Sequence, residues 1–260
     1  MPIHPAFTLS WTRRGVLAGQ IRPLIIYQSY DIIKPAAWEK TLMRLLHVDS
    51  SARHAGSSSR ALSAFFVDAL RRGLPGLEVD RLDVAVDPPP HATELFTAAA
   101  YTPADQRTPE MIEALRVSDA LCDRVLAADA IVLGVPMYNF GMPSALKALV
   151  DNIVRGGRTY IWGADHQIVG QLGGRRVLFV TARGADFCAG SGREEFDALT
   201  PGLRAIFGFL GVTDMAFIDA QPLQFGGEDA KADAIARARA SLLDMAGTWI
   251  ATSSIREAVA

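Results

Sequence analysis

Residues 130–147 read AIVLGVPMYNFGMPSALK, and this stretch decides the fold. Its first six residues are apolar or small, which is typical of a buried strand, and this strand ends at Pro136. A polar and aromatic loop follows before helical spacing resumes. In open α/β sheets, ligands bind at such strand-to-helix crossings, beyond the carboxyl ends of the strands. The rings of Tyr138 and Phe140 and the amide of Asn139 suit a flat ligand with a polar edge.

A second crossing of this kind lies at residues 45–60, which read LLHVDSSARHAGSSSR. Small hydroxyl residues lie here between an expected strand and the N-terminus of an expected helix, whose N–H groups favour an anion. No acidic residue lies between Ser50 and Arg60, and the loop carries two cations, Arg53 and Arg60. We interpret the loop as a phosphate site. The alternative is a serine N-cap within a flexible loop.

Strands and helices alternate along the rest of the chain. Strands are expected at 42–49, 77–82, 130–135, 175–181 and 213–219, and helices at 58–72, 93–100, 108–127, 144–154, 194–210 and 229–246. A hairpin or lid is expected at 158–169. This alternation predicts an α/β fold with a doubly wound, five-stranded parallel sheet. The flavodoxin-like strand order would place a ligand between the first and third strands.

On these residues the chain resembles the family of FMN-dependent NADH azoreductases and NAD(P)H quinone reductases, which has a flavodoxin-like fold. The resemblance extends from about residue 43 to about residue 246 and rests on four segments. These segments are 48–51 with 57–59, 107–111, 136–140 and 181–185, of which 136–140 is the most specific.

The resemblance implies a tightly bound, non-covalent FMN and a set of residues around it. Those that would hold the phosphate are Ser51, Ser57, Ser58 and Ser59. Those that would contact the isoalloxazine ring and ribityl chain are Met137, Tyr138, Asn139 and Phe140. Those that would line the pyrimidine side of the ring are Ala182, Arg183, Gly184 and Ala185.

The third of these loops departs from the Ser-Arg-Gly-Gly that is usual in the family. Ala182 lacks a hydroxyl, and Ala185 adds a methyl group that would resist a backbone with positive φ. The departure leaves open whether flavin affinity is altered.

The resemblance also implies a reaction. NADH or NADPH would reduce the flavin and leave, and a quinone or azo compound would then take two electrons at the same site, in a ping-pong cycle. We assign no catalytic residue, because flavin and water can supply the protons. In the family the pocket lies at a homodimer interface, and Tyr160, Trp162 and Phe209 resemble its aromatic walls. The alternative for Phe209 is a core position at the end of a helix.

Composition excludes several other classes of protein. The chain has 260 residues, of which 50% are hydrophobic, and its net charge of −2 gives no basis for binding nucleic acid. Two cysteines, Cys122 and Cys188, suggest a reducing, cytoplasmic location, with both thiols at least partly buried. The five histidines lack the spacing of metal ligands, and no segment is apolar for long enough to cross a membrane.

The N-terminal residues differ from the rest of the chain. Residues 12–17 read TRRGVL, which resembles a twin-arginine export signal, but Arg22 interrupts the apolar stretch that follows. We interpret residues 1–41 as a poorly ordered extension, with translation beginning at Met43, and residues 42–260 as one FMN-binding domain.

Two other functions remain open at this point. One is a non-enzymatic electron carrier of the flavodoxin type, although the insertions 88–107 and 158–174 are better suited to a substrate pocket. The other is a regulatory protein that kept the fold, with or without its flavin.

Overall fold

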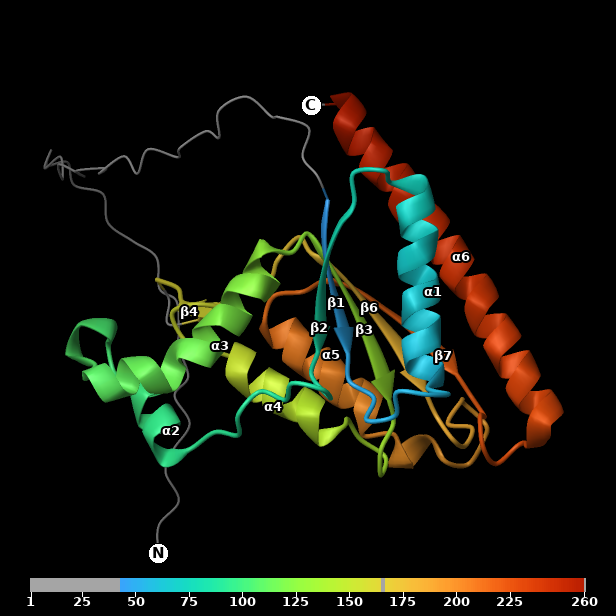
Figure 1. Cartoon of the computed structure of the whole chain (residues 1–260), viewed down its shortest axis with the longest axis horizontal. Coiled ribbons are helices and arrows are strands. Elements are labelled where there is room, and N and C mark those ends of the chain that lie inside the picture. Colours follow the sequence, from blue (N-terminus) through green and yellow to red (C-terminus); the bar gives the residue numbers. More distant parts are fainter. Residues whose placement is uncertain (1–42, 165–166, 260) are drawn as a thin grey trace, which may run out of the picture. The chain divides into compact units, whose positions relative to one another are not determined.

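The computed structural model describes residues 43–164 and 167–259. The extension expected at 1–41 therefore lies outside the described residues. In the described part, five parallel strands form one sheet in the order β2-β1-β3-β6-β7. The strands are β1 (Arg44–Asp49), β2 (Glu78–Asp83), β3 (Ala130–Pro136), β6 (Arg176–Ala182) and β7 (Asp214–Ala220). This is the predicted flavodoxin-like order, and every strand lies within two residues of its expected position (Figure 1).

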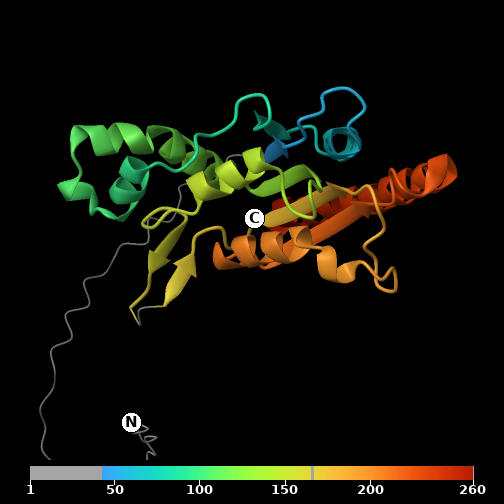
Figure 2. The same cartoon turned by 90° about the horizontal axis from the view of Figure 1, so that it is seen from below.

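Helices cover both faces of this sheet. The helices of the described residues are α1 (Ser58–Gly73), α2 (Glu94–Tyr101), α3 (Pro109–Ala127), α4 (Ser144–Ile153), α5 (Leu199–Phe209) and α6 (Gly227–Val259), of which α2 packs against α3. Helices α1 and α6 pack on one face, around the edge-to-face pair of Phe66 and Trp249. Helices α3, α4 and α5 pack on the other face (Figure 2). There Phe207 lies against Phe179. The central strand β3 is buried throughout, because it is covered from both sides.

Local signals explain several helix boundaries. The Thr108 side chain accepts from the Met111 N–H at 3.3 Å, and Pro109 occupies the first turn of α3, as expected. The helix expected at 194–210 is instead a short 3₁₀ turn, Glu194–Phe196, followed by α5. The Asp197 carboxylate accepts from the N–H groups of Leu199 and Thr200, both at 3.0 Å, and so begins a new helix.

Helix α6 runs beyond the expected end at residue 246. Trp249 is buried against Phe66, and Arg176 donates to Thr252 Oγ1 at 2.6 Å. These tertiary contacts lie outside the local periodicity and extend the helix.

The expected hairpin is confirmed as an antiparallel pair, β4 (Tyr160–Trp162) and β5 (Ile168–Gly170). Among the described residues, no helix has the length and apolar character that crossing a membrane requires.

Candidate functional site

Three loops meet at the carboxyl edge of the sheet, after β1, β3 and β6. The Tyr138 hydroxyl, after β3, accepts from the Ala52 N–H at 3.2 Å and lies 3.4 Å from Ser51 Oγ, after β1. On the other side of β3, the Met137 N–H donates to the Ala182 carbonyl at 2.9 Å. The sequence placed these segments on separate crossings, and the structure brings them side by side.

The serine loop presents hydroxyls and N–H groups at the start of α1. Ser57 is the N-cap, and its Oγ lies 3.3 Å from Ser59 Oγ. The first turn of α1 contains no acidic residue. Within the described part of the chain, the N–H groups of Ser58 and Ser59 donate to no acceptor. This donor set, at the positive end of a 16-residue helix, suits a phosphate group.

Arg60 does not act as the free cation that the sequence suggested for this loop. Its guanidinium donates to both oxygens of Asp83, at 2.5 and 2.8 Å, and to the Ser51 carbonyl, at 2.6 and 3.1 Å. The hydrogen bond between the two side chains raises the pKa of Arg60 and lowers the pKa of Asp83. Arg60 therefore holds the start of the serine loop in place, while Arg53 and His54 are exposed.

A buried polar network lies beneath the serine loop. His47 Nε2 lies 3.0 Å from Ser63 Oγ, and Ser63 Oγ donates to Asp49 Oδ1 at 3.3 Å. Burial lowers the pKa of His47, although the nearby Asp49 opposes the shift. Gly134 on β3 faces this network, because a Cβ there would lie 2.8 Å from Ser63 Oγ and 3.1 Å from the Ser59 carbonyl. The absence of a side chain at Gly134 lets α1 approach the sheet closely.

The loop after β3 contains a strained turn. Tyr138 and Gly141 exchange two backbone hydrogen bonds of 3.0 Å, and Asn139 and Phe140 between them have φ angles of 48° and 70°. Asparagine tolerates this left-handed conformation, but a phenylalanine rarely adopts it. Such strain is concentrated at binding sites, and here it exposes both side chains.

The loop after β6 is positioned by Arg183, whose side chain is buried. Its guanidinium donates to Asp197, Thr200, Thr181 and Asp219, at 2.6 to 3.3 Å, and its N–H donates to the Ala220 carbonyl. The side chain of Arg183 therefore faces the protein interior, whereas Gly184 and Ala185 are half-buried.

Ala185 does not adopt the left-handed backbone conformation, with positive φ, that its methyl group would resist. Among the described residues, positive φ angles at non-glycine positions occur at Asn139 and Phe140, and Ala185 is not in this group. Within the same part of the chain, the N–H groups of Gly184 and Ala185 donate to no acceptor. The loop can therefore offer two backbone donors to the edge of a ring despite the added methyl group.

The three aromatic residues expected in the substrate pocket lie away from the three loops. Tyr160 packs edge-to-face on Phe209, at 5.0 Å between ring centroids, and Trp162 is 65% exposed. Helices α4 and α5 begin at the carboxyl edge and end beside this hairpin (Figure 1). The ten residues of α4 alone span about 15 Å. A single copy of the chain does not bring these aromatic residues to the three loops.

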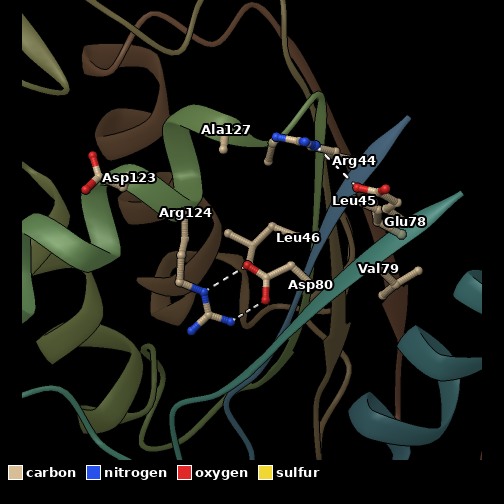
Figure 3. A pocket seen from close by; sticks show the side chains of 10 residues that line it. Arg44, Leu45, Leu46, Glu78, Val79, Asp80, Asp123, Arg124 and Ala127 are labelled. Carbon is tan, nitrogen blue, oxygen red and sulfur yellow. Dashed lines mark hydrogen bonds and ion pairs between the residues drawn. The ribbon is translucent and has the colours of Figure 1, made fainter. Parts of the chain in front are cut away.

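Two cavities lie at opposite edges of the sheet. A cavity of about 310 Å³ at the carboxyl edge is lined by Ser50 and Tyr138, together with Pro88 and the first residues of α4. A cavity of about 440 Å³ at the amino edge is lined by charged residues that pair with one another, Arg44 with Glu78 and Arg124 with Asp80 (Figure 3). Asp123, which also lines the larger cavity, pairs with Arg158, so the charged side chains around this cavity are already paired and the carboxyl edge is the candidate site.

The structure also reveals features that the sequence motifs did not indicate. Phe187 and Phe196 lie against Phe140, and no motif points to either of them. Cys122 is buried, as expected, but Cys188 is exposed rather than partly buried. The Gln221 amide donates to its sulfur at 3.1 Å.

Comparisons with known proteins agree with this geometry. A family model described as "Flavodoxin-like fold" matches residues 43–245. An FMN-dependent NADH:quinone oxidoreductase of Nostoc punctiforme is 45% identical over 208 residues, which are 80% of this chain and 100% of the relative. A protein of the same name from Azospirillum brasilense is 39% identical over 198 residues, which are 76% of this chain and 94% of the relative.

Solved structures show the same fold. An azoreductase from Bacillus anthracis superposes with a TM-score of 0.72 at 21% identity, covering 79% of this chain and 99% of that one. An FMN-dependent NADH-azoreductase from the same species, in complex with FMN, also gives a TM-score of 0.72, at 20% identity, covering 80% and 99%.

Proposed function

The chain belongs to the family with the flavodoxin-like fold that includes the FMN-dependent NADH:quinone oxidoreductases, and we propose that it is itself such an enzyme. The observation that supports this most strongly is that three loops meet at one edge of the sheet and that, among the described residues, the serine loop and the loop after β6 present N–H groups without an acceptor. Such donors suit a ligand that has a phosphate at one end and a ring with polar edges at the other.

Each loop has a distinct part in holding FMN. The phosphate is bound by the serine loop, through Ser51, Ser57, Ser58 and Ser59. The ring and the ribityl chain are contacted by the loop after β3, through Met137, Tyr138, Asn139 and Phe140. The pyrimidine side of the ring is lined by the loop after β6, through Ala182, Arg183, Gly184 and Ala185. Within the last group, Gly184 and Ala185 donate through their N–H groups, whereas the buried Arg183 side chain positions the loop.

The bound FMN supplies two-electron transfer between NADH and a quinone or azo acceptor. The chain's own contribution is to bind and orient, because the titratable side chains of Tyr138 and Arg183, in the two loops proposed to contact the ring, are already engaged by other groups. The Tyr138 hydroxyl is occupied by Ala52 and Ser51, and the Arg183 guanidinium is buried among four partners. Protons come from solvent.

We propose that NADH and the acceptor bind in turn at the same face of the flavin ring. Initial velocities of NADH oxidation, measured against menadione at several fixed NADH concentrations, should then give parallel double-reciprocal lines. Intersecting lines would mean that both substrates bind together, and would overturn the shared site.

We further propose that the enzyme acts as a homodimer. The hairpin exposes Ile161, Trp162, Ile168 and Val169, and neighbouring Phe209 is 40% exposed. Exposed apolar patches of this kind mark interfaces, and a second copy could bring its hairpin to the three loops of the first. Tyr160, Trp162 and Phe209 would then bound the substrate pocket of the partner.

Trp162→Ala tests this arrangement. The variant should change the ratio of kcat/KM values for quinones of different size while its flavin content stays at the wild-type level, and sedimentation velocity should report the dimer. Equal loss of flavin and activity would contradict the assignment of Trp162 to the pocket.

We place the enzyme in the cytoplasm, which the two free thiols support.

A further inference from the structure

Three phenylalanine rings gather beside the candidate flavin site. Phe140, from the loop after β3, lies 6.4 Å from Phe187 and 5.7 Å from Phe196, measured between ring centroids. Phe140 is 53% exposed and Phe196 is 50% exposed, and Phe187 is half-buried. We name these three residues the aromatic cluster. Contiguous exposed aromatic surface is uncommon unless it binds something.

The aromatic cluster is held in a defined position. The Phe140 carbonyl accepts from the Ala198 N–H at 3.0 Å, two residues beyond Phe196. The Phe187 N–H donates to Gln221 Oε1 at 3.0 Å. Buried Arg183 donates to Asp197, which follows Phe196, and its guanidinium lies 6.0 Å from the centre of the Phe187 ring. These contacts tie the cluster to the two loops that are proposed to hold the flavin ring.

We propose that Phe187 and Phe196 extend the acceptor site into a platform that favours neutral, fused-ring quinones, an inference that rests on the proposed function. Flat aromatic rings stack with an offset or edge-to-face on other rings, and a bicyclic quinone is long enough to cover a ring beyond the flavin. Single-ring quinones have no second ring to place there.

The charges around the aromatic cluster determine which acceptors fit. The exposed carboxylates of Glu194 and Glu195 directly precede Phe196, and Arg193 is the one basic residue between positions 186 and 197. Asp186 adds a third carboxylate to this segment, whereas the charge of Asp197 is paired with that of Arg183. An acidic rim of this kind disfavours anionic acceptors such as sulfonated azo dyes, and leaves neutral quinones unaffected.

The reaction at this platform balances without a further reactant. NADH gives up a hydride, the quinone gains that hydride together with one proton from solvent, and the products are NAD⁺ and a hydroquinone. The platform forms no bond to the quinone, so its residues act on substrate binding and orientation.

The test is Phe196→Leu, which keeps an apolar side chain of similar bulk and removes the ring. With the flavin-loaded enzyme, kcat/KM for 2-methyl-1,4-naphthoquinone should fall by about 3- to 10-fold, the range expected for one aromatic contact. The value for 1,4-benzoquinone, and the anaerobic rate of flavin reduction by NADH, should stay within about twofold of wild type. Phe196→Tyr, which retains a ring, should restore the naphthoquinone value.

Controls separate this inference from the proposed function. Phe65→Leu, a partly buried ring on the opposite face of the sheet, should leave the selectivity between the two quinones unchanged. If Phe196→Leu lowers kcat/KM equally for both quinones, or for neither, the platform is overturned. Normal reduction of the flavin by NADH in that variant would still support the proposed function. Dissociation of a wild-type dimer by Phe196→Leu would also overturn it, because the ring would then be a subunit contact. An enzyme that NADH fails to reduce overturns the proposed function itself.

Discussion

Gly134→Ala should displace the start of α1 and with it the phosphate site. The added Cβ would lie 2.8 Å from Ser63 Oγ and 3.1 Å from both Asp49 Oδ1 and the Ser59 carbonyl, whereas ordinary contacts begin at 3.4 Å. The Ser59 carbonyl belongs to the backbone of the first turn of α1, so the helix itself must move by a few tenths of an ångström. Overpacking of this kind destabilises a protein by about 1–3 kcal/mol.

A double-mutant cycle with Ser63→Ala locates the strain. Ser63→Ala removes the nearest atom but leaves His47 without its 3.0 Å partner, at a cost of about 1–3 kcal/mol for a buried polar group. The double variant should be less destabilised than the sum of the two single variants, by about 0.5–2 kcal/mol, because the closest clash is gone.

Urea denaturation of the flavin-free proteins measures both free energies, and titration with FMN, followed by flavin fluorescence, measures binding. Gly134→Ala should lower FMN affinity by more than Ser63→Ala does, since it moves the N–H groups of Ser58 and Ser59. Wild-type stability and wild-type FMN affinity in Gly134→Ala would refute the close approach of α1 and β3.

Three further predictions concern single residues. Because burial lowers the pKa of His47, the unfolded chain binds more protons below about pH 6.5, so the free energy of unfolding should fall as the pH drops from 6.5 to 5. In His47→Gln this fall should be smaller when urea midpoints are compared at the two pH values, and an unchanged slope would argue against a buried neutral imidazole. Burial raises the pKa of the Cys122 thiol to about 11. Ellman's reagent at pH 8 should therefore modify only the exposed Cys188 in the native protein, and both thiols in guanidinium. Rapid modification of two thiols in the native protein would contradict the buried position of Cys122. Ala185→Gly should leave the Kd for FMN within about twofold of wild type, because Ala185 does not occupy the left-handed region, and a tenfold gain in affinity would show that the methyl group obstructs the flavin.

The strand and helix pattern predicted the sheet because both kinds of element have local signatures. The apolar run 130–135 and the threonine cap at Thr108 produce β3 and α3 where expected. The break before α5 was not predicted, because it depends on the Asp197 carboxylate that caps Leu199 and Thr200. The extra turns of α6 were not predicted either, because Trp249 reaches Phe66 from far along the chain.

At the candidate site, too, the sequence predicted the loops but not the contacts between residues far apart in the chain. Sequence order placed the three loops at one edge, but it did not reveal that Arg60 and Arg183 are occupied by carboxylates of the protein. Phe187 and Phe196 were not predicted, because only the folded structure brings their rings against Phe140 and no sequence motif contains them. The aromatic residues of the hairpin were assigned by resemblance, and sequence alone could not show that α4 separates them from the three loops of the same chain.

The visible absorption spectrum of the purified protein, recorded anaerobically before and after NADH is added, decides whether the three loops hold a flavin that NADH reduces. A flavin site formed by the three loops predicts a flavin spectrum with about one FMN per chain, which NADH bleaches and a naphthoquinone then restores. A protein that remains colourless after incubation with FMN would contradict the claim that the three loops form a flavin site.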